Sequence, residues 1–274
     1  MKERIFSAML VLLILVAAIA CGSNEQQITG DELIDGILAS IENQETSRLE
    51  MSMDFTMTGT FDGEYSEIDY SMDANGVIDM AAQEMQLDMT TSMNMRATTQ
   101  TEETSIVKEY ILGDMAYVGL VSQVAPTEWV RGDVSEDFWE SQDYVSSQIA
   151  LVRGGEAVIS GTANVKGINC YVAEISPDMD EILEYMSSQL EQEDLSVELT
   201  EDSISNYIMK GWYATDTFFP MKSHQEFDMK VDIEGNEVTY HFIIDTLFYD
   251  WNKPVSIELP PDVEEAEYVG PIDM

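Results

Sequence analysis

The feature that most constrains the fold is a regular alternation of apolar and polar residues that begins near residue 49. Apolar residues occupy the odd positions from Leu49 to Met57, and acidic, Ser or Thr residues occupy the even positions between them. Successive side chains of a β-strand point to opposite faces of a sheet, so this period of two predicts a strand with one apolar and one solvated face. A helix is excluded here, because its apolar residues recur every three or four positions.

The same alternation recurs along most of the chain. We expect about nine strands within the segments 49–58, 65–80, 85–95, 105–112, 115–121, 157–165, 168–175, 205–215, 222–233, 238–249 and 255–259. The Asn75-Gly76 pair inside the second segment indicates either a hairpin turn or a β-bulge, and both interpretations remain open.

Three segments have the pattern of helices. The first begins at Thr29, where Glu32 completes a capping box, and should end near Asn43. The others are predicted at 135–152 and 176–190. Strands arrive in two batches without β-α-β alternation, which predicts an α+β fold: one long antiparallel sheet with about three helices on one face.

The N-terminus predicts the compartment. Lys2 and Arg4 precede an apolar run that ends at Cys21, which is the layout of a secretory signal followed by a lipidated cysteine. Ala18 stands where Leu is usual in such a signal, and an uncleaved signal anchor is the alternative. We expect a signal peptide at 1–20, a lipidated tether at 21–28, a single domain at 29–262 and an acidic tail at 263–274. This organisation predicts a protein anchored by Cys21 to the extracytoplasmic face of the cell membrane.

The net charge limits the classes of partner that the protein can bind. Asp and Glu number 53 against 12 Lys and Arg, a formal charge of −41, which excludes nucleic acid as a partner because phosphate binding needs clustered cations. Cation binding is one interpretation of the charge. Solubility or salt adaptation is the favoured one, because the acids are spread along the chain and no loop has a calcium-binding pattern.

The chain resembles the LolA-like and LppX-like lipoproteins. The resemblance is carried by 110–118 leading to Trp129, by 165–172, and by 249–254 leading to 259–260. These are framework motifs of strands and turns. The resemblance implies an incomplete β-barrel wrapped around helices, and a group in which several members carry lipids or acyl chains in the cavity between the two. It implies no residue-specific function.

Catalytic motifs are sparse. His224 and His241 lack a partner at metal-ligand spacing, and no nucleophile motif is present, so we expect no enzyme, no metal and no cofactor. Each His is interpreted as an ordinary hydrogen-bonded or exposed side chain. Cys170 is interpreted as a small buried residue rather than a reactive thiol.

Methionine is the unusual residue. Nine of the 18 methionines fall within residues 51–95, mostly on the apolar phase of the predicted strands. They either fill a core or line a deformable cavity, since unbranched thioethers repack around varied apolar groups. Four tyrosines could hold polar ligand ends at a cavity mouth, although core positions are favoured: Tyr65, Tyr70, Tyr110 and Tyr117. The residues predicted to contact a ligand are Met53, Phe55, Met57, Met72, Leu87, Met89 and Met93.

Two functions follow from these patterns. The leading hypothesis is a carrier or sensor that binds a lipid or acyl chain non-covalently between the sheet and the helices. The alternative is a surface module with a filled core, whose acidic outer face docks an unknown protein partner. A hydrolase is a distant third.

Overall fold

The computed structural model describes residues 28–61, 64–96, 100–121, 126–134, 139, 152, 155–180, 182, 183, 187, 199–233 and 236–272. One α-helix and twelve strands are delimited within these residues. They are α2 (Gly30–Ile41), β1 (Thr46–Phe61), β2 (Glu64–Asp79), β3 (Glu84–Arg96), β4 (Gln100–Leu112), β5 (Met115–Val121), β6 (Glu128–Asp133), β7 (Glu156–Val165), β8 (Ile168–Ser176), β9 (Ile204–Ala214), β10 (Pro220–Ile233), β11 (Asn236–Tyr249) and β12 (Glu267–Tyr268). Two short 3₁₀ helices, η1 (Glu201–Ser203) and η2 (Pro261–Glu265), complete the set.

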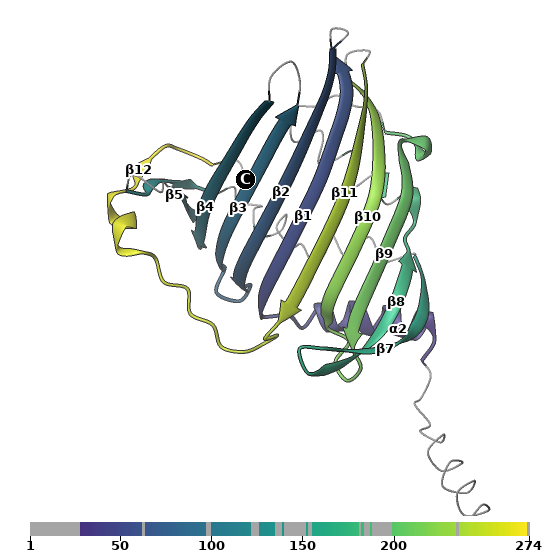
Figure 1. Ribbon diagram of the computed structural model, residues 1–274. Helices are drawn as coiled ribbons and strands as arrows, with labels where there is room; N and C mark the ends of the chain where they lie inside the picture. The colour runs from purple at the N-terminus through teal and green to yellow at the C-terminus, as the bar shows by residue number, and fades with distance from the viewer. Residues whose placement is uncertain are drawn as a thin grey trace, which may run out of the picture.

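All twelve strands form one open, curved sheet in the order β12-β6-β5-β4-β3-β2-β1-β11-β10-β9-β8-β7 (Figure 1). Neighbouring strands are antiparallel, except that β12 runs parallel to β6. The two batches of strands join where β1 pairs with β11 along twelve residue pairs, from Arg48 with Tyr249 to Gly59 with Val238. The predicted long antiparallel sheet is therefore confirmed.

Ten of the eleven segments predicted as strands form strands of this sheet, one predicted strand is wrong, and two strands were missed. Strands β6 and β12 were not predicted, since six and two residues are too short to show a period of two. Segment 255–259 forms no strand. Its alternation has another cause: Ile257 and Leu259 pack against a cluster that contains Tyr110 and Trp129.

Asn75-Gly76 is neither a turn nor a bulge. Both residues lie inside β2, whose register with β1 and β3 is unbroken. Gly76 sits between Leu49 and Leu87 in the same cross-strand row. A Cβ atom at Gly76 would lie 2.5 Å from Leu87 Cδ2 and 3.2 Å from Leu49 Cγ. The glycine therefore provides space for two large apolar neighbours rather than a change in chain direction.

Helix α2 begins with the predicted capping box. Thr29 Oγ1 accepts a hydrogen bond from the Glu32 amide at 3.2 Å, and the Glu32 carboxylate accepts one from the Thr29 amide at 2.8 Å. Its apolar side packs on the β7–β9 end of the sheet, near the bottom of Figure 1. The residues of α2 buried there are Leu33, Ile34, Ile37 and Ile41.

The prediction of about three helices is not supported. Within the part of the chain that is described, α2 is the one complete α-helix. Of the other two predicted helices, 135–152 lies largely outside the described residues, and 176–190 lies outside them in part. None of the described helical segments is long and apolar enough to cross a membrane.

Residues 255–272 form a strap across the β4–β6 end of the sheet (Figure 1). Val263 and Ala266 are buried against Tyr110 and Trp129. The Trp129 indole donates a hydrogen bond of 2.9 Å to the Asp262 carboxylate. Much of the segment assigned from sequence to an acidic tail is therefore packed on the sheet and contributes β12 to it.

Candidate functional site

The candidate site is one face of the sheet, which we call the inner face because α2 packs against it. Residues directly opposite each other on antiparallel strands share a face. Met53 lies opposite Met72 on β2 and Ile244 on β11, and this row continues through Gln225 to Met209. Met209 belongs to the cluster that buries α2. Met53 is therefore on the same face as the helix.

The register places all of the predicted ligand-contacting residues on this inner face. They are Met53, Phe55, Met57, Met72, Leu87, Met89 and Met93. The prediction that they face the helix-bearing side is confirmed, while their contact with a ligand stays a prediction.

Exposure divides the inner face into two regions. On β9 and β10 it is packed: Met209 and Met229 retain 3% and 6% of their accessible surface. On β11, Val238 is buried, but Tyr240, Phe242 and Ile244 are half-buried. On β1–β3, all seven predicted residues are half-buried instead. Met57 lies at the boundary, since it packs against the cluster that contains Met229 and Val238. The half-buried methionines thus form an apolar surface beside a closed core.

A row of aromatic rings crosses the inner face of five neighbouring strands. Tyr70 stacks on Phe55 with ring centroids 4.8 Å apart, and Phe55 contacts Phe242 at 5.5 Å. Phe242 stacks on Phe227 at 4.8 Å, and Phe227 stacks on Tyr207 at 5.7 Å. The row links the half-buried region on β1 and β2 to the packed core on β9 and β10, and such ring contacts stabilise the sheet beyond simple burial.

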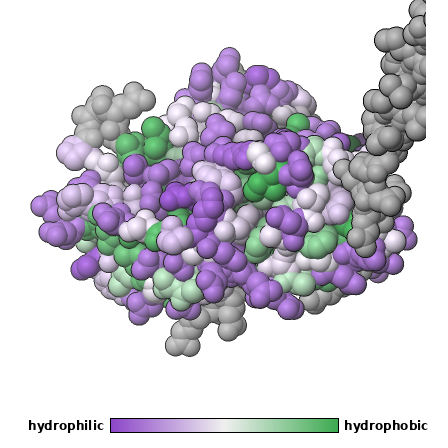
Figure 2. Space-filling model, turned by 90° about the horizontal axis from the view of Figure 1, so that it is seen from below, coloured by the Kyte–Doolittle hydropathy of each residue, from purple (hydrophilic) through white to green (hydrophobic). Residues whose placement is uncertain are grey.

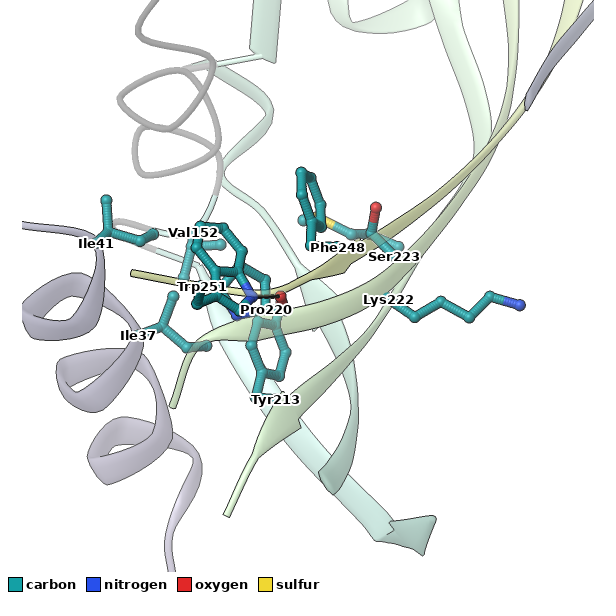
Figure 3. Close-up of a pocket in the computed structure, with 10 residues that line it drawn as sticks. Ile37, Ile41, Val152, Tyr213, Pro220, Lys222, Ser223, Phe248 and Trp251 are labelled. Atoms are coloured by element: carbon teal, nitrogen blue, oxygen red, sulfur yellow. Dashed lines mark hydrogen bonds between the residues drawn. The ribbon is translucent and has the colours of Figure 1, made fainter. Parts of the chain in front are cut away.

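A small cavity lies beneath α2 (Figure 3). Ile37 and Ile41 reach into it from the helix, and Tyr213 and Trp251 reach it from the sheet side. The Trp251 indole is held by a hydrogen bond of 3.0 Å to the carbonyl of Pro220. The cavity volume of about 30 Å³ is close to the space that one water molecule occupies. An acyl chain does not fit there.

Among the described residues, Glu109 carries the one carboxyl group that lies between the apolar side chains of this region. It stands on the inner face of β4, opposite Leu87 on β3 and Val118 on β5. Burial raises the pKa of its carboxyl group, because an apolar environment disfavours the charged form. Within the described residues, no hydrogen bond or ion pair to its side chain is present.

The raised pKa of Glu109 predicts a pH-dependent cost to stability. The folded protein holds this proton more tightly than the unfolded chain does, so stability falls as pH rises from the ordinary value of 4.5 through the raised pKa. We expect Glu109→Gln, which carries no charge, to be more stable than wild type above that range. The difference should vanish in acid, and urea unfolding across pH measures it. Equal stability of the two proteins at alkaline pH would contradict the inner-face position of this carboxyl.

The four tyrosines proposed for a cavity mouth separate on folding. Tyr70 joins the aromatic row on the inner face. Tyr110 is buried on the opposite, outer face, where Tyr117 also packs against the strap cluster. Tyr65 is 60% exposed near the end of β2 and hydrogen-bonds Glu67 at 3.1 Å. The mouth interpretation is therefore wrong for Tyr110.

Both histidines lie on the outer face and contact carboxylates. His241 Nδ1 lies 2.7 Å from Asp228 Oδ1, and the Asn206 amide donates to Asp228 Oδ2 at 2.6 Å. These contacts lower the pKa of Asp228, chiefly through the Asn206 hydrogen bond. His241 lies opposite Thr56 on β1. The Thr56 hydroxyl donates its hydrogen bond to Asp69 at 3.1 Å and not to His241, so the two residues do not form a nucleophile and base pair. The arrangement is a surface hydrogen-bond network.

Other reactive groups are few in the described part of the chain. Cys170 is fully buried, and burial raises the pKa of its thiol, which disfavours the nucleophilic thiolate. Across the same residues, no group of three His, Cys, Asp or Glu side chains is placed to hold a metal ion.

Sequence reasoning missed Glu109 and most of the aromatic row. Phe242 alternates with the polar residues His241 and Asp245 and with Thr239 in 238–249, so the face on which it lies could have been predicted. That β1 pairs with β11 could not, because nothing in the local pattern selects a partner strand so far along the chain. Glu109 could not have been recognised, because apolar residues occupy both the odd and the even positions of 105–112.

The chain is similar to several solved structures, at low identity. Lipoprotein LppX of Mycobacterium tuberculosis is 14% identical, with 83% of this chain and 99% of that chain covered and a TM-score of 0.40. LprF of Mycobacterium bovis is 11% identical, with 85% and 99% covered and a TM-score of 0.43. A putative outer membrane lipoprotein-sorting domain from Vibrio parahaemolyticus is 10% identical, with 83% and 94% covered and a TM-score of 0.22.

No protein-family model and no curated protein matches the sequence. Because the TM-scores are low, the fold rests on this chain's own strand order and register.

Proposed function

We propose that the protein is a membrane-anchored lipoprotein that binds a lipid or acyl chain non-covalently on the inner face of its sheet, as a carrier or sensor and not as an enzyme. The observation that carries the proposal is the half-buried methionine surface on β1–β3. This surface lies on the same face as the buried core of β9 and β10, but its side chains are less buried than those of the core. Apolar side chains left accessible over several neighbouring strands are typical of binding surfaces.

The physical driving force is burial of apolar surface, which contributes roughly 25 cal/mol per Å² removed from water. Methionine suits this role because its flexible thioether adapts to ligands of different shape. Met89 and Met93 on β3 lie diagonally across from Met72 on β2. An acyl chain lying along this surface would contact all three strands β1–β3.

The proposed location is the extracytoplasmic face of the cell membrane, with Cys21 as the lipid anchor. The apolar run that precedes this cysteine supports the proposal. A lipid-binding face on an anchored protein would also lie close to the membrane that supplies its ligand.

Matched methionine substitutions test whether the surface binds a ligand. Met209 is 3% exposed in the core, so Met209→Ala should cost about 2–5 kcal/mol of unfolding free energy. Met89 is half-buried on the same face, so Met89→Ala should cost clearly less. We expect Met89→Ala instead to weaken binding of a fluorescent fatty alcohol. Urea unfolding and probe titration measure the two effects on the same samples.

The alternative function makes the opposite prediction. If the protein is an interaction module with a filled core, Met89→Ala will destabilise as much as Met209→Ala, and wild type will not bind the probe. Native mass spectrometry after gentle purification gives a second, independent readout. Co-purified lipid mass supports the carrier, and bare protein mass together with absent probe binding supports the module.

A further inference from the structure

The basic residues of the sheet all lie on one side. The described strands contain Arg48, Arg96, Lys108, Arg131, Lys210, Lys222 and Lys230, and the register places each of them on the outer face. Figure 3 shows the Lys222 side chain pointing away from the cavity beneath α2. Both histidines share the outer face. The inner face of the described strands therefore offers no cation.

Most of these cations already form ion pairs with carboxylates on the outer face. Lys108 pairs with Asp88, Lys222 with Asp245 at 3.5 Å, and Lys230 with Glu237 at 2.7 Å. None of these side chains can reach the inner face unless its ion pair breaks and its strand shifts register, because the alternation of a strand fixes each side chain to one face. The surface seen from the end of the sheet is mostly hydrophilic, with hydrophobic residues in small patches (Figure 2).

The inner face does carry negative groups. Glu109 stands among Leu87, Val107 and Val118, and Glu103 lies further along the same strand, opposite Met93. Both side chains border the half-buried methionine surface, because Met89 and Met93 face β4 directly. The polar end of an amphiphile bound on this face of the described strands can therefore meet carboxyl groups but no lysine or arginine.

We infer that the ligand of the inner face is a neutral or cationic amphiphile, and that Glu109 excludes anionic lipids and fatty acids. This inference rests on the proposed lipid-binding function and specifies its ligand class. An anionic headgroup would approach Glu109 in a poorly solvated environment, where like charges repel strongly. A hydroxyl or ester group can hydrogen-bond the carboxyl, and an ammonium group can pair with it.

Three amphiphiles with one tail and different headgroups test the inference: dodecanol, dodecylamine and dodecanoate. The affinity of each amphiphile is measured by its displacement of the neutral dye Nile red from the protein that begins at residue 21. The titrations are made at mildly alkaline pH and physiological ionic strength. We expect dodecanoate to bind wild type on the order of tenfold more weakly than dodecanol. Glu109→Gln should remove this difference in affinity between dodecanol and dodecanoate, and it should weaken dodecylamine binding. Glu103→Gln, at an exposed inner-face carboxylate of the same strand, is the matched control and should have a smaller effect.

The outcomes separate this inference from the proposed function. If Nile red and dodecanol fail to bind wild type, the lipid-binding function itself is overturned. If dodecanol binds and dodecanoate binds equally well, the function stands and the ligand class is wrong. Binding of all three amphiphiles that is unchanged by Glu109→Gln removes Glu109 as the selecting group. Circular dichroism and Nile red affinity establish that the variant is folded, and Glu109→Asp, which keeps the charge, should retain the wild-type preference.

Discussion

Cys21→Ser should release the protein from the membrane completely. The acyl chains predicted on Cys21 contribute roughly 0.8 kcal/mol per buried methylene, so their loss removes the anchor. Membrane fractionation with a high-salt wash measures the effect, and intact mass reports whether acylation and signal cleavage took place. Cys170→Ser is the matched control, because it makes the same substitution at the other cysteine of the chain. That variant should stay with the membrane.

Either of two results would contradict the anchor prediction. If Cys21→Ser has a cleaved signal and still sediments with membranes after the salt wash, another part of the chain attaches it. Release of wild type by salt alone would point to the same conclusion, since acyl chains are not displaced by screening of charges.

Leu33→Ala should strongly destabilise the folded protein. Leu33 has no accessible surface and lies in the cluster that joins α2 to β8 and β9. Truncation removes its transfer free energy and leaves a void, for a cost of about 2–5 kcal/mol. Urea denaturation gives the value from the shift in midpoint at constant slope.

Leu120→Ala is the matched control, since Leu120 is 55% exposed on β5. The same substitution there should change stability by no more than about 0.5 kcal/mol. Equal effects at the two positions would mean that α2 does not pack on the sheet in solution as described. A lower slope in Leu33→Ala would instead indicate that the helix detaches before the sheet unfolds.

The strands and the first helix could be predicted because their signals are local. The capping box of Thr29 and Glu32 satisfies amides within one helical turn, and it forms as expected. The alternation of apolar residues on β1 and β3 determines which side chains share a face, whatever the neighbouring strands are. For this reason Met53, Phe55, Met89 and Leu87 were placed on one face correctly.

Features that depend on distant partners were mispredicted or missed. Gly76 suggested a turn or a β-bulge, but the nearby Leu49 and Leu87 side chains explain why a glycine stands there. Segment 255–259 suggested a strand, but its apolar side chains pack on Tyr110 and Trp129. In both cases a local pattern had a tertiary cause, and a single sequence does not distinguish the two.

The sequence by itself determined most of the strands and the set of residues on the apolar face of each, because both depend on neighbours within a few positions. Only the tertiary structure decided which strands meet, how far the core closes over that face, and where the charges go. Register between β1 and β11 assembles the aromatic row, and register between β3, β4 and β5 places Glu109 among apolar residues. Pairing partners are selected by the free energy of the whole sheet, which no local segment encodes.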